Sequence, residues 1–171
     1  KIIWIDGTFG IGKSAVAAAI VEEIPQASLL EFDALQEKYK PTSVSDYFGK
    51  RYPEAKKYLV DALVDEITEI IQEGSCDCLV IPVALINDYC NQKLIDGFAN
   101  IESHHFILMA KKEILHQRIN NQENRDIDLA VTYMSEATQY LSNRYYDASR
   151  IDTSNMSIDS VAKEIIESIT R

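Results

Sequence analysis

Positive charge and cysteine are both scarce in this chain of 171 residues. Lysine and arginine number 17 against 27 aspartates and glutamates, which gives a formal net charge of −10. This excess of negative charge repels nucleic-acid phosphates and anionic lipids, so no nucleic-acid surface is expected, although a local positive pocket can hold a small anion. The three cysteines give neither a disulfide framework nor a zinc pattern, because the pair Cys76 and Cys78 lacks a second pair of ligands.

Long apolar runs are missing as well. No stretch reaches the roughly 18 apolar residues of a membrane span, and no charged-then-apolar signal segment precedes the first expected strand. We therefore expect a cytoplasmic protein with free thiols and no stable membrane insertion. Internal repeats and low-complexity segments are also missing, and the length fits one domain over residues 1–171.

Apolar strands and helical segments alternate along the whole sequence. We expect strands at 1–6, 28–32, 78–83, 105–110 and 150–152, and helices at 13–24, 53–73, 87–98, 112–121, 129–143 and from 157 onward. Continuously apolar strands are buried on both faces, which predicts an α/β fold with a parallel sheet between two layers of helices. Ligands of such sheets bind beyond the carboxyl ends of the strands.

The segment GTFGIGKS, residues 7–14, matches the phosphate-binding pattern G-x-x-x-x-G-K-[ST]. A strand precedes it and a helix follows, as a backbone anion nest requires, whereas a chance glycine turn needs neither. Lys13 is expected to reach the β and γ phosphates of ATP, and Ser14 to bind Mg²⁺. The predicted nucleotide-binding residues here are Gly7, Thr8, Phe9, Gly10, Ile11, Gly12, Lys13, Ser14 and Ala15.

A carboxylate that would assist phosphoryl transfer is harder to find. The strand CLVIPV at 78–83 ends without an acid. Asp33, after the second expected strand, is the best-placed candidate to orient or deprotonate an acceptor hydroxyl or to help hold Mg²⁺; its alternative role is to cap the following helix. Asp88 is a weaker candidate, since the start of a surface helix explains it.

Two arginines belong to this region: Arg118 precedes the polar segment 121–129, and Arg125 lies within it. Arginines here can stabilise the charge of a transferring phosphoryl group or stack on adenine, and solvated helix charges are the alternative. Arg144 could point into the same cleft. His104 and His105 are expected to be structural, and His116 to lie on a helix surface. The basic cluster within 38–51 either meets an anionic acceptor or solvates a loop.

Four blocks of the sequence resemble the tunicamycin-resistance (TmrB-like) group of P-loop ATP-binding proteins, in the nucleoside-monophosphate-kinase-like superfamily. They are IIWIDGTFGIGKS, VIPVAL, HHFILMAKKEILHQRI and RIDTSNMSIDSVAKEI, and residues 34–75 contribute nothing to the likeness. The resemblance implies five parallel strands in the order 2-3-1-4-5 and a lid over about 119–144. It also implies that Arg118 lies over the adenine, that Asp152 and Thr153 lie near the base, and that Asp33 is functional.

Three functions remain open from the sequence. In the first, the chain is a kinase that uses ATP and Mg²⁺, with Lys13, Asp33, Arg118 and Arg125 as catalytic residues and a small acceptor, such as a nucleoside antibiotic, between 33–60 and 84–92. In the second, it binds ATP and sequesters a drug such as tunicamycin, or senses a metabolite, without phosphoryl transfer. A toxin that phosphorylates nucleotide sugars is a third reading. A homodimer through the tyrosine-rich segments 39–58 and 133–146 is also open.

Overall fold

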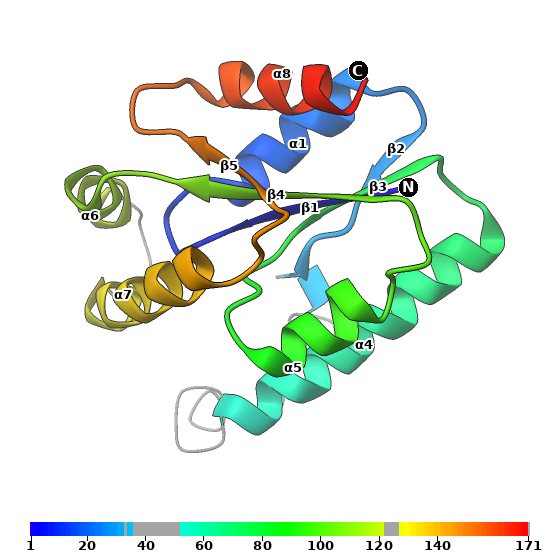
Figure 1. Cartoon of the computed structure of the whole chain (residues 1–171), viewed down its shortest axis with the longest axis horizontal. Coiled ribbons are helices and arrows are strands. Elements are labelled where there is room, and N and C mark those ends of the chain that lie inside the picture. Colours follow the sequence, from blue (N-terminus) through cyan, green and yellow to red (C-terminus); the bar gives the residue numbers. More distant parts are fainter. Residues whose placement is uncertain (33, 36–51, 122–126, 171) are drawn as a thin grey trace.

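A computed structural model describes residues 1–32, 34–35, 52–121 and 127–170. Five parallel strands form one sheet in the order β2-β3-β1-β4-β5 (Figure 1), which confirms the predicted α/β fold and strand order. The elements are β1 (Ile2–Gly7), α1 (Lys13–Glu23), β2 (Ala27–Leu29), α4 (Tyr52–Glu73), β3 (Cys78–Pro82), α5 (Asp88–Cys90), the π-helix η1 (Asn91–Asp96), β4 (Ser103–Met109), α6 (Lys112–Asn120), α7 (Ile127–Asn143), β5 (Ser149–Asp152) and α8 (Ile158–Ile169).

The central strand β1 divides the hydrophobic core into two layers. Successive side chains of a strand point to opposite faces, so Ile3 and Ile5 pack on one side of the sheet while Ile2 and Trp4 pack on the other. Both faces are covered, which is why the whole strand is buried and reads as a continuous apolar run.

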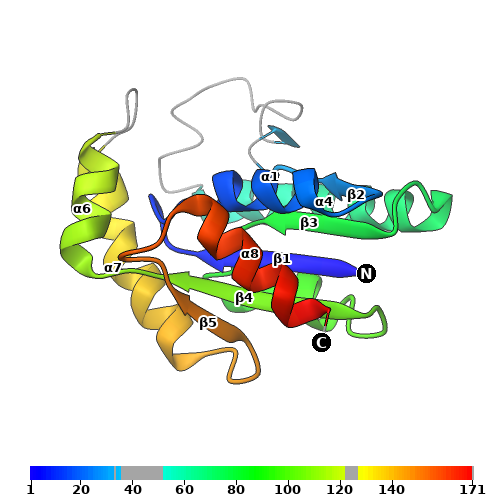
Figure 2. The same cartoon turned by 90° about the horizontal axis from the view of Figure 1, so that it is seen from above.

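Helices α1 and α8 cover the Ile3 face, and α4, α5 and η1 cover the Trp4 face. The two layers are clear in Figure 1, and Figure 2 shows from above that α1 runs along the strands while α8 lies obliquely across them. The aromatic rings of Trp4 and Phe98 have centroids 6.5 Å apart, which ties the segment after η1 to the sheet. The N-cap of α8 is Ser157, whose hydroxyl accepts a hydrogen bond from the Ser160 amide.

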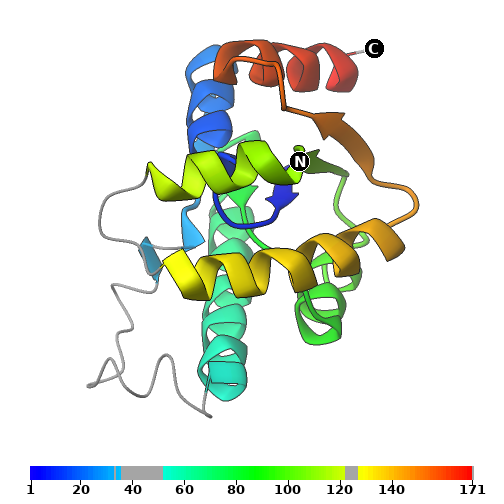
Figure 3. The same ribbon diagram turned by 90° about the vertical axis from the view of Figure 1, so that its left-hand side faces the viewer.

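The remaining helices, α6 and α7, lie at the carboxyl end of the sheet. Figure 3 shows the chain turn that follows β1 between these two helices. Two hydrogen bonds agree with this arrangement: the Thr8 hydroxyl donates to the carbonyl of Met134 on α7, and Arg118 on α6 donates to the carbonyl of Ile11. The predicted phosphate-binding segment therefore lies where parallel sheets bind ligands.

Two expected elements differ in detail. Strand β2 ends at Leu29 rather than at residue 32, and the expected helix 87–98 is a short α-helix followed by the π-helix η1. The buried residues of this segment, Cys90, Leu94 and Phe98, recur every four positions. This spacing is longer than the 3.6 residues of an α-helical turn. The wider turn of a π-helix therefore keeps all three side chains on the face toward the core. Within the described ranges, no helix is long and apolar enough to span a membrane.

Candidate functional site

The glycine loop, residues 7–14, has the backbone conformation that an anion nest needs. Gly7 and Gly12 have φ angles of 149° and 101°, in a region that residues with a Cβ atom rarely adopt. Gly12 caps the N-terminus of α1, and the first turn of that helix carries no acidic residue. The amide groups and the positive end of the helix dipole are therefore available to a negatively charged group.

The side chain of Lys13 folds back over this loop. Its ammonium group donates hydrogen bonds of 3.0 Å to the carbonyl oxygens of Gly7 and of Thr8. The same nitrogen lies 6.0 Å from the centre of the Phe9 ring. The charge of Lys13 is thus held directly above the loop, where the sequence pattern predicts phosphate oxygens.

Glu31 is a site residue that the sequence reasoning missed. The hydroxyl of Ser14 donates a hydrogen bond of 3.1 Å to Oε2 of Glu31. Glu31 was assigned to the second strand, but β2 ends two residues earlier, so its carboxylate emerges at the carboxyl edge beside α1. The available signal was the pair of acids Glu31 and Asp33 directly after an apolar strand.

Ser14 and Glu31 suit a magnesium ion chemically. A hydroxyl and a carboxylate oxygen are hard donors, and Mg²⁺ is usually held by one or two protein ligands together with substrate phosphates and water. No group of three or more His, Cys, Asp or Glu side chains able to hold a metal occurs among the residues with described positions. The pair therefore fits a phosphate-bound Mg²⁺ better than a metal held by protein ligands alone.

Arg118 joins the glycine loop to the turn after β5. Its guanidinium donates to the carbonyl of Ile11 at 3.3 Å, to the hydroxyl of Thr153 at 3.0 Å and to the carbonyl of Thr153 at 2.9 Å. Thr153 is buried, and its hydroxyl in turn donates to the carbonyl of Met109. The structure thus brings together three of the residues predicted to surround the nucleotide.

Asp152, the neighbouring predicted residue, caps its own turn. Its carboxylate accepts a hydrogen bond of 2.9 Å from the Ser154 amide. The hydrogen bonds from the Ser154 side chain and backbone lower the pKa of Asp152 below its usual value. Asp152 is therefore a stable anion that orders the loop carrying Thr153.

Two predicted catalytic residues, Asp33 and Arg125, lie outside the described residues, as does the basic cluster within 38–51. Arg144 forms an ion pair of 3.2 Å with Asp88 at the start of α5. The hydroxyl of Tyr140 donates to the same carboxylate at 2.8 Å. Arg144 and Asp88 thus connect α7 to α5, and neither hydrogen-bonds the glycine loop.

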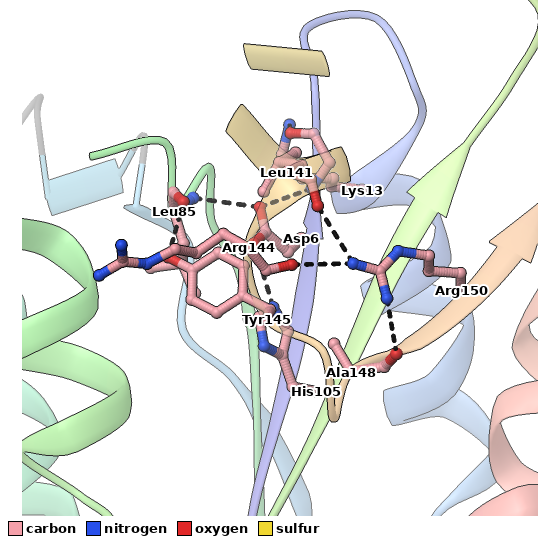
Figure 4. Close-up of polar contacts among 10 residues, drawn as sticks. Asp6, Lys13, Leu85, His105, Leu141, Arg144, Tyr145, Ala148 and Arg150 are labelled. Atoms are coloured by element: carbon pink, nitrogen blue, oxygen red, sulfur yellow. Dashed lines mark hydrogen bonds and ion pairs between the residues drawn. The ribbon is translucent and has the colours of Figure 1, made fainter. Parts of the chain in front are cut away.

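Asp6, the residue immediately before the glycine loop, has a fully buried side chain. One carboxylate oxygen, Oδ1, accepts hydrogen bonds from the amides of Gly7 at 2.7 Å and of Leu85 at 3.1 Å. The other, Oδ2, lies 3.0 Å from Nε2 of His105 on β4. Figure 4 shows this carboxylate among Leu85, His105 and Tyr145, which together with Asp6 form the Asp6 cluster. The sequence predicts a structural role for His105, but it does not predict this buried carboxylate as its partner.

Tyr145 closes the cluster from the side of α7. Its hydroxyl donates a hydrogen bond of 2.8 Å to the carbonyl of Leu85, and its ring meets that of His105 edge-on at 4.8 Å between centroids. Burial and the charge of Asp6 raise the pKa of Tyr145 well above its usual value. Burial and the hydrogen bond to Asp88 raise the pKa of Tyr140 to about 12. Both hydroxyls therefore remain protonated donors at neutral pH.

Comparisons with known proteins identify the fold. Neither a scan against protein-family models nor a search of curated proteins found a match. Among solved structures, the tunicamycin resistance protein of Deinococcus radiodurans aligns with 99% of this chain and 95% of its own, at a TM-score of 0.65 and 19% identity. Shikimate kinase from Acinetobacter baumannii in complex with shikimate aligns with 99% and 92%, at a TM-score of 0.74 and 16% identity.

A sugar kinase from Janibacter aligns over 99% of this chain and 94% of its own, at a TM-score of 0.69 and 13% identity. At these identities the likeness shows the fold and not the reaction. It agrees with the parallel sheet order 2-3-1-4-5 and with the glycine loop between β1 and α1. The chain therefore shares the α/β fold of these solved proteins, with the strand order that the sequence resemblance predicted.

Proposed function

We propose that this protein is an ATP-dependent kinase that transfers the γ-phosphate to a hydroxyl group of a small molecule. The observation that carries the proposal is the Ser14–Glu31 hydrogen bond next to Lys13, at the N-terminus of α1. A P-loop alone binds phosphate, but a carboxylate beside the P-loop hydroxyl adds the acid that the strand CLVIPV lacks. Several structural neighbours are kinases of small molecules, which supports this class of reaction.

On this proposal, the glycine loop binds the phosphates through its amides and Lys13 binds the β and γ phosphates. Ser14 and Glu31 would hold Mg²⁺, which supplies charge neutralisation of the phosphates when bound. Because phosphoryl transfer depends on positioning and electrostatic stabilisation, these groups carry much of the catalytic effect. Asp33 is proposed to orient and deprotonate the acceptor hydroxyl.

The contacts of Arg118 support a place on the nucleotide side. Its guanidinium bridges the glycine loop and Thr153, so we propose that it packs against the adenine while Asp152 and Thr153 border the base. Arg125 remains the proposed cation for the transferring phosphoryl group. We further propose that residues 119–144 act as a lid that excludes water during transfer.

The second candidate is an ATP-dependent drug-binding protein that acts by sequestration. Its support is the fold likeness to a protein described as a tunicamycin resistance protein. The Ser14–Glu31 pair suits both candidates, because both bind ATP; the small-molecule kinases among the structural neighbours favour the kinase.

A direct test incubates the protein with ATP, Mg²⁺ and a panel of tunicamycin, nucleosides, sugars, aminoglycosides, shikimate and gluconate. We expect mass spectrometry to detect one acceptor that is heavier by a phosphoryl group, and Asp33→Asn to bind ATP without making this product. If no acceptor is phosphorylated while tunicamycin raises the melting temperature only with ATP present, the sequestration reading is correct.

The variant Glu31→Gln tests the proposed magnesium pair. Glutamine keeps the size and one oxygen of Glu31 but removes its charge, so we expect the strengthening of ATP binding by Mg²⁺ to fall by about tenfold, or about 1.4 kcal/mol. Calorimetric titration of ATP with and without Mg²⁺ measures this difference. Glu22→Gln, an exposed charge change on α1, is the matched control and should leave it unchanged. An undiminished magnesium effect in Glu31→Gln would exclude Glu31 from the site.

A further inference from the structure

The buried carboxylate of Asp6 has no part in the proposed chemistry, yet it links its own neighbour Gly7 to two distant segments. It accepts hydrogen bonds from Gly7 at the start of the glycine loop and from Leu85 in the β3–α5 loop (residues 83–87), and it contacts His105 on β4. A buried carboxylate is costly unless its oxygens are satisfied, and three polar partners here offset that cost. Removing the carboxylate would leave buried N–H groups without acceptors.

The bonds to Gly7 and Leu85 go to the same oxygen atom. Oδ1 lies 2.7 Å from the Gly7 nitrogen and 3.1 Å from the Leu85 nitrogen. Both amides therefore donate to the same atom, Oδ1 of Asp6. If one loop moves relative to the other, at least one of these two hydrogen bonds must stretch or break. The last backbone hydrogen bond between this loop and β1 runs from the Val83 amide to the Ile5 carbonyl at 3.0 Å, and two residues later the Asp6 carboxylate is the acceptor for the Leu85 amide.

The peptide of Leu85 is also held from its other side. The Tyr145 hydroxyl donates to the Leu85 carbonyl, so both polar groups of this buried residue are fixed by side chains from distant segments (Figure 4). Tyr145 has a φ angle of 57°, an unusual conformation for a residue with a large side chain.

Arg150 supports this strained turn. Its guanidinium donates to the carbonyl oxygens of Leu141, Arg144 and Ala148, which surround Tyr145 in the connection from α7 to β5. The backbone before and after Tyr145 is thereby anchored to one side chain (Figure 4). By holding this backbone, Arg150 helps to keep the Tyr145 side chain directed toward the carbonyl of Leu85.

We propose that Asp6 is a positioning residue that holds the glycine loop and the β3–α5 loop in one frame, with Tyr145 fixing the second loop from the side of α7. The inference rests on the proposed kinase function, in which the first loop binds the phosphate donor and the second borders the acceptor. In-line transfer depends on the relative placement of these two substrates, which a single bridging oxygen keeps constant. Asp6 itself touches neither reacting group.

The test compares Asp6→Ala, Asp6→Asn and Tyr145→Phe by two measurements, amide hydrogen exchange without nucleotide and calorimetric binding of ATP with Mg²⁺. In Asp6→Ala we expect amide exchange at Leu85 to accelerate by about tenfold or more and ATP affinity to fall by about tenfold. Asp6→Asn should restore most of both, because its amide oxygen can accept the same two N–H groups while its amino group donates to His105. Tyr145→Phe should accelerate exchange in the β3–α5 loop and leave ATP affinity within about twofold.

The control is Val80→Ala, which opens a cavity in the fully buried middle of β3, at a position outside both loops. It should lower the melting temperature without changing ATP affinity or Leu85 exchange relative to its neighbours. If Val80→Ala matches Asp6→Ala in both measurements, or Asp6→Asn rescues neither, Asp6 only supports the core. Should Asp6→Ala not fold, Asp6→Ser carries the same expectation, because its hydroxyl is too short to reach both amides.

Failure of the two proposals can be separated. If the wild-type protein binds no ATP, the proposed function is wrong, and the exchange of Leu85 in the nucleotide-free variants still decides whether Asp6 couples the loops. If the wild type binds ATP and Asp6→Ala changes neither affinity nor exchange, the kinase proposal stands and the positioning role is overturned.

Discussion

Lys13→Ala is expected to weaken ATP binding by about a hundredfold or more, which corresponds to roughly 2.7 kcal/mol. The side chain lies over the glycine loop, where its ammonium group already donates to the carbonyls of Gly7 and Thr8. On nucleotide binding it would form charge-assisted bonds to the phosphates, which are about twice as strong as bonds between neutral groups. Calorimetric titration with ATP and Mg²⁺ measures the loss.

The fold should tolerate this change. In the ligand-free protein, Lys13 is half-buried, and its two bonds to loop carbonyls are not part of the core. Lys163→Ala on α8, a charge removal at a side chain that is 77% exposed, is the matched control and should bind ATP normally. Wild-type affinity in a folded Lys13→Ala protein would overturn the assignment of residues 7–14 as a phosphate-binding loop.

The second large effect is expected from Gly7→Ala, compared with Gly12→Ala. A Cβ atom on Gly7 would lie 2.9 Å from the carbonyl oxygen of Leu108 and 2.9 Å from Cγ2 of Ile11, at a φ of 149°. Backbone strain of about 1–3 kcal/mol and overpacking of about 1–3 kcal/mol then combine, so we expect the free energy of unfolding to fall by about 2–5 kcal/mol. Urea denaturation measures the change.

Gly12→Ala separates the two contributions. Its φ of 101° is also strained for alanine, but a Cβ atom there meets no atom within 4 Å. We therefore expect only the strain, about 1–2 kcal/mol, with the loss at Gly7 clearly larger. If both variants lose the same free energy of unfolding, the added Cβ atom at Gly7 has not clashed with Leu108 on β4. The glycine loop would then be loosely packed against that strand.

Much of the architecture could be predicted from the sequence. The strands at the centre of the sheet are buried on both faces and appear as continuous apolar runs, and the glycine loop has a pattern whose positions have separate physical roles. The strand order came from the resemblance rather than from periodicity, and the structure confirms it. The expected helix 87–98 corresponds to α5 and η1, but its π-helical turn was not predicted, because a four-residue spacing of buried positions is close to the 3.6-residue period of an α-helix.

The site was less predictable than the fold. Glu31 was missed because an acid at the end of an apolar run does not show where the strand ends, and its partnership with Ser14 links positions 17 apart. Asp6 was seen only as the end of a strand, although its partners lie 79 and 99 residues away. Arg118 and Thr153 were placed together through the resemblance, and their hydrogen bonds now show that they touch.

The sequence alone determined the alternating α/β pattern and the glycine loop, because both depend on residues that are close together in the chain. Hydrophobic periodicity and the backbone freedom of glycine act over a few positions, so they can be read locally. Only the tertiary structure decided which acid meets Ser14 and which segments meet at Asp6. Those contacts depend on where parallel strands end relative to one another, and that register is set by packing of the whole sheet against its two helical layers.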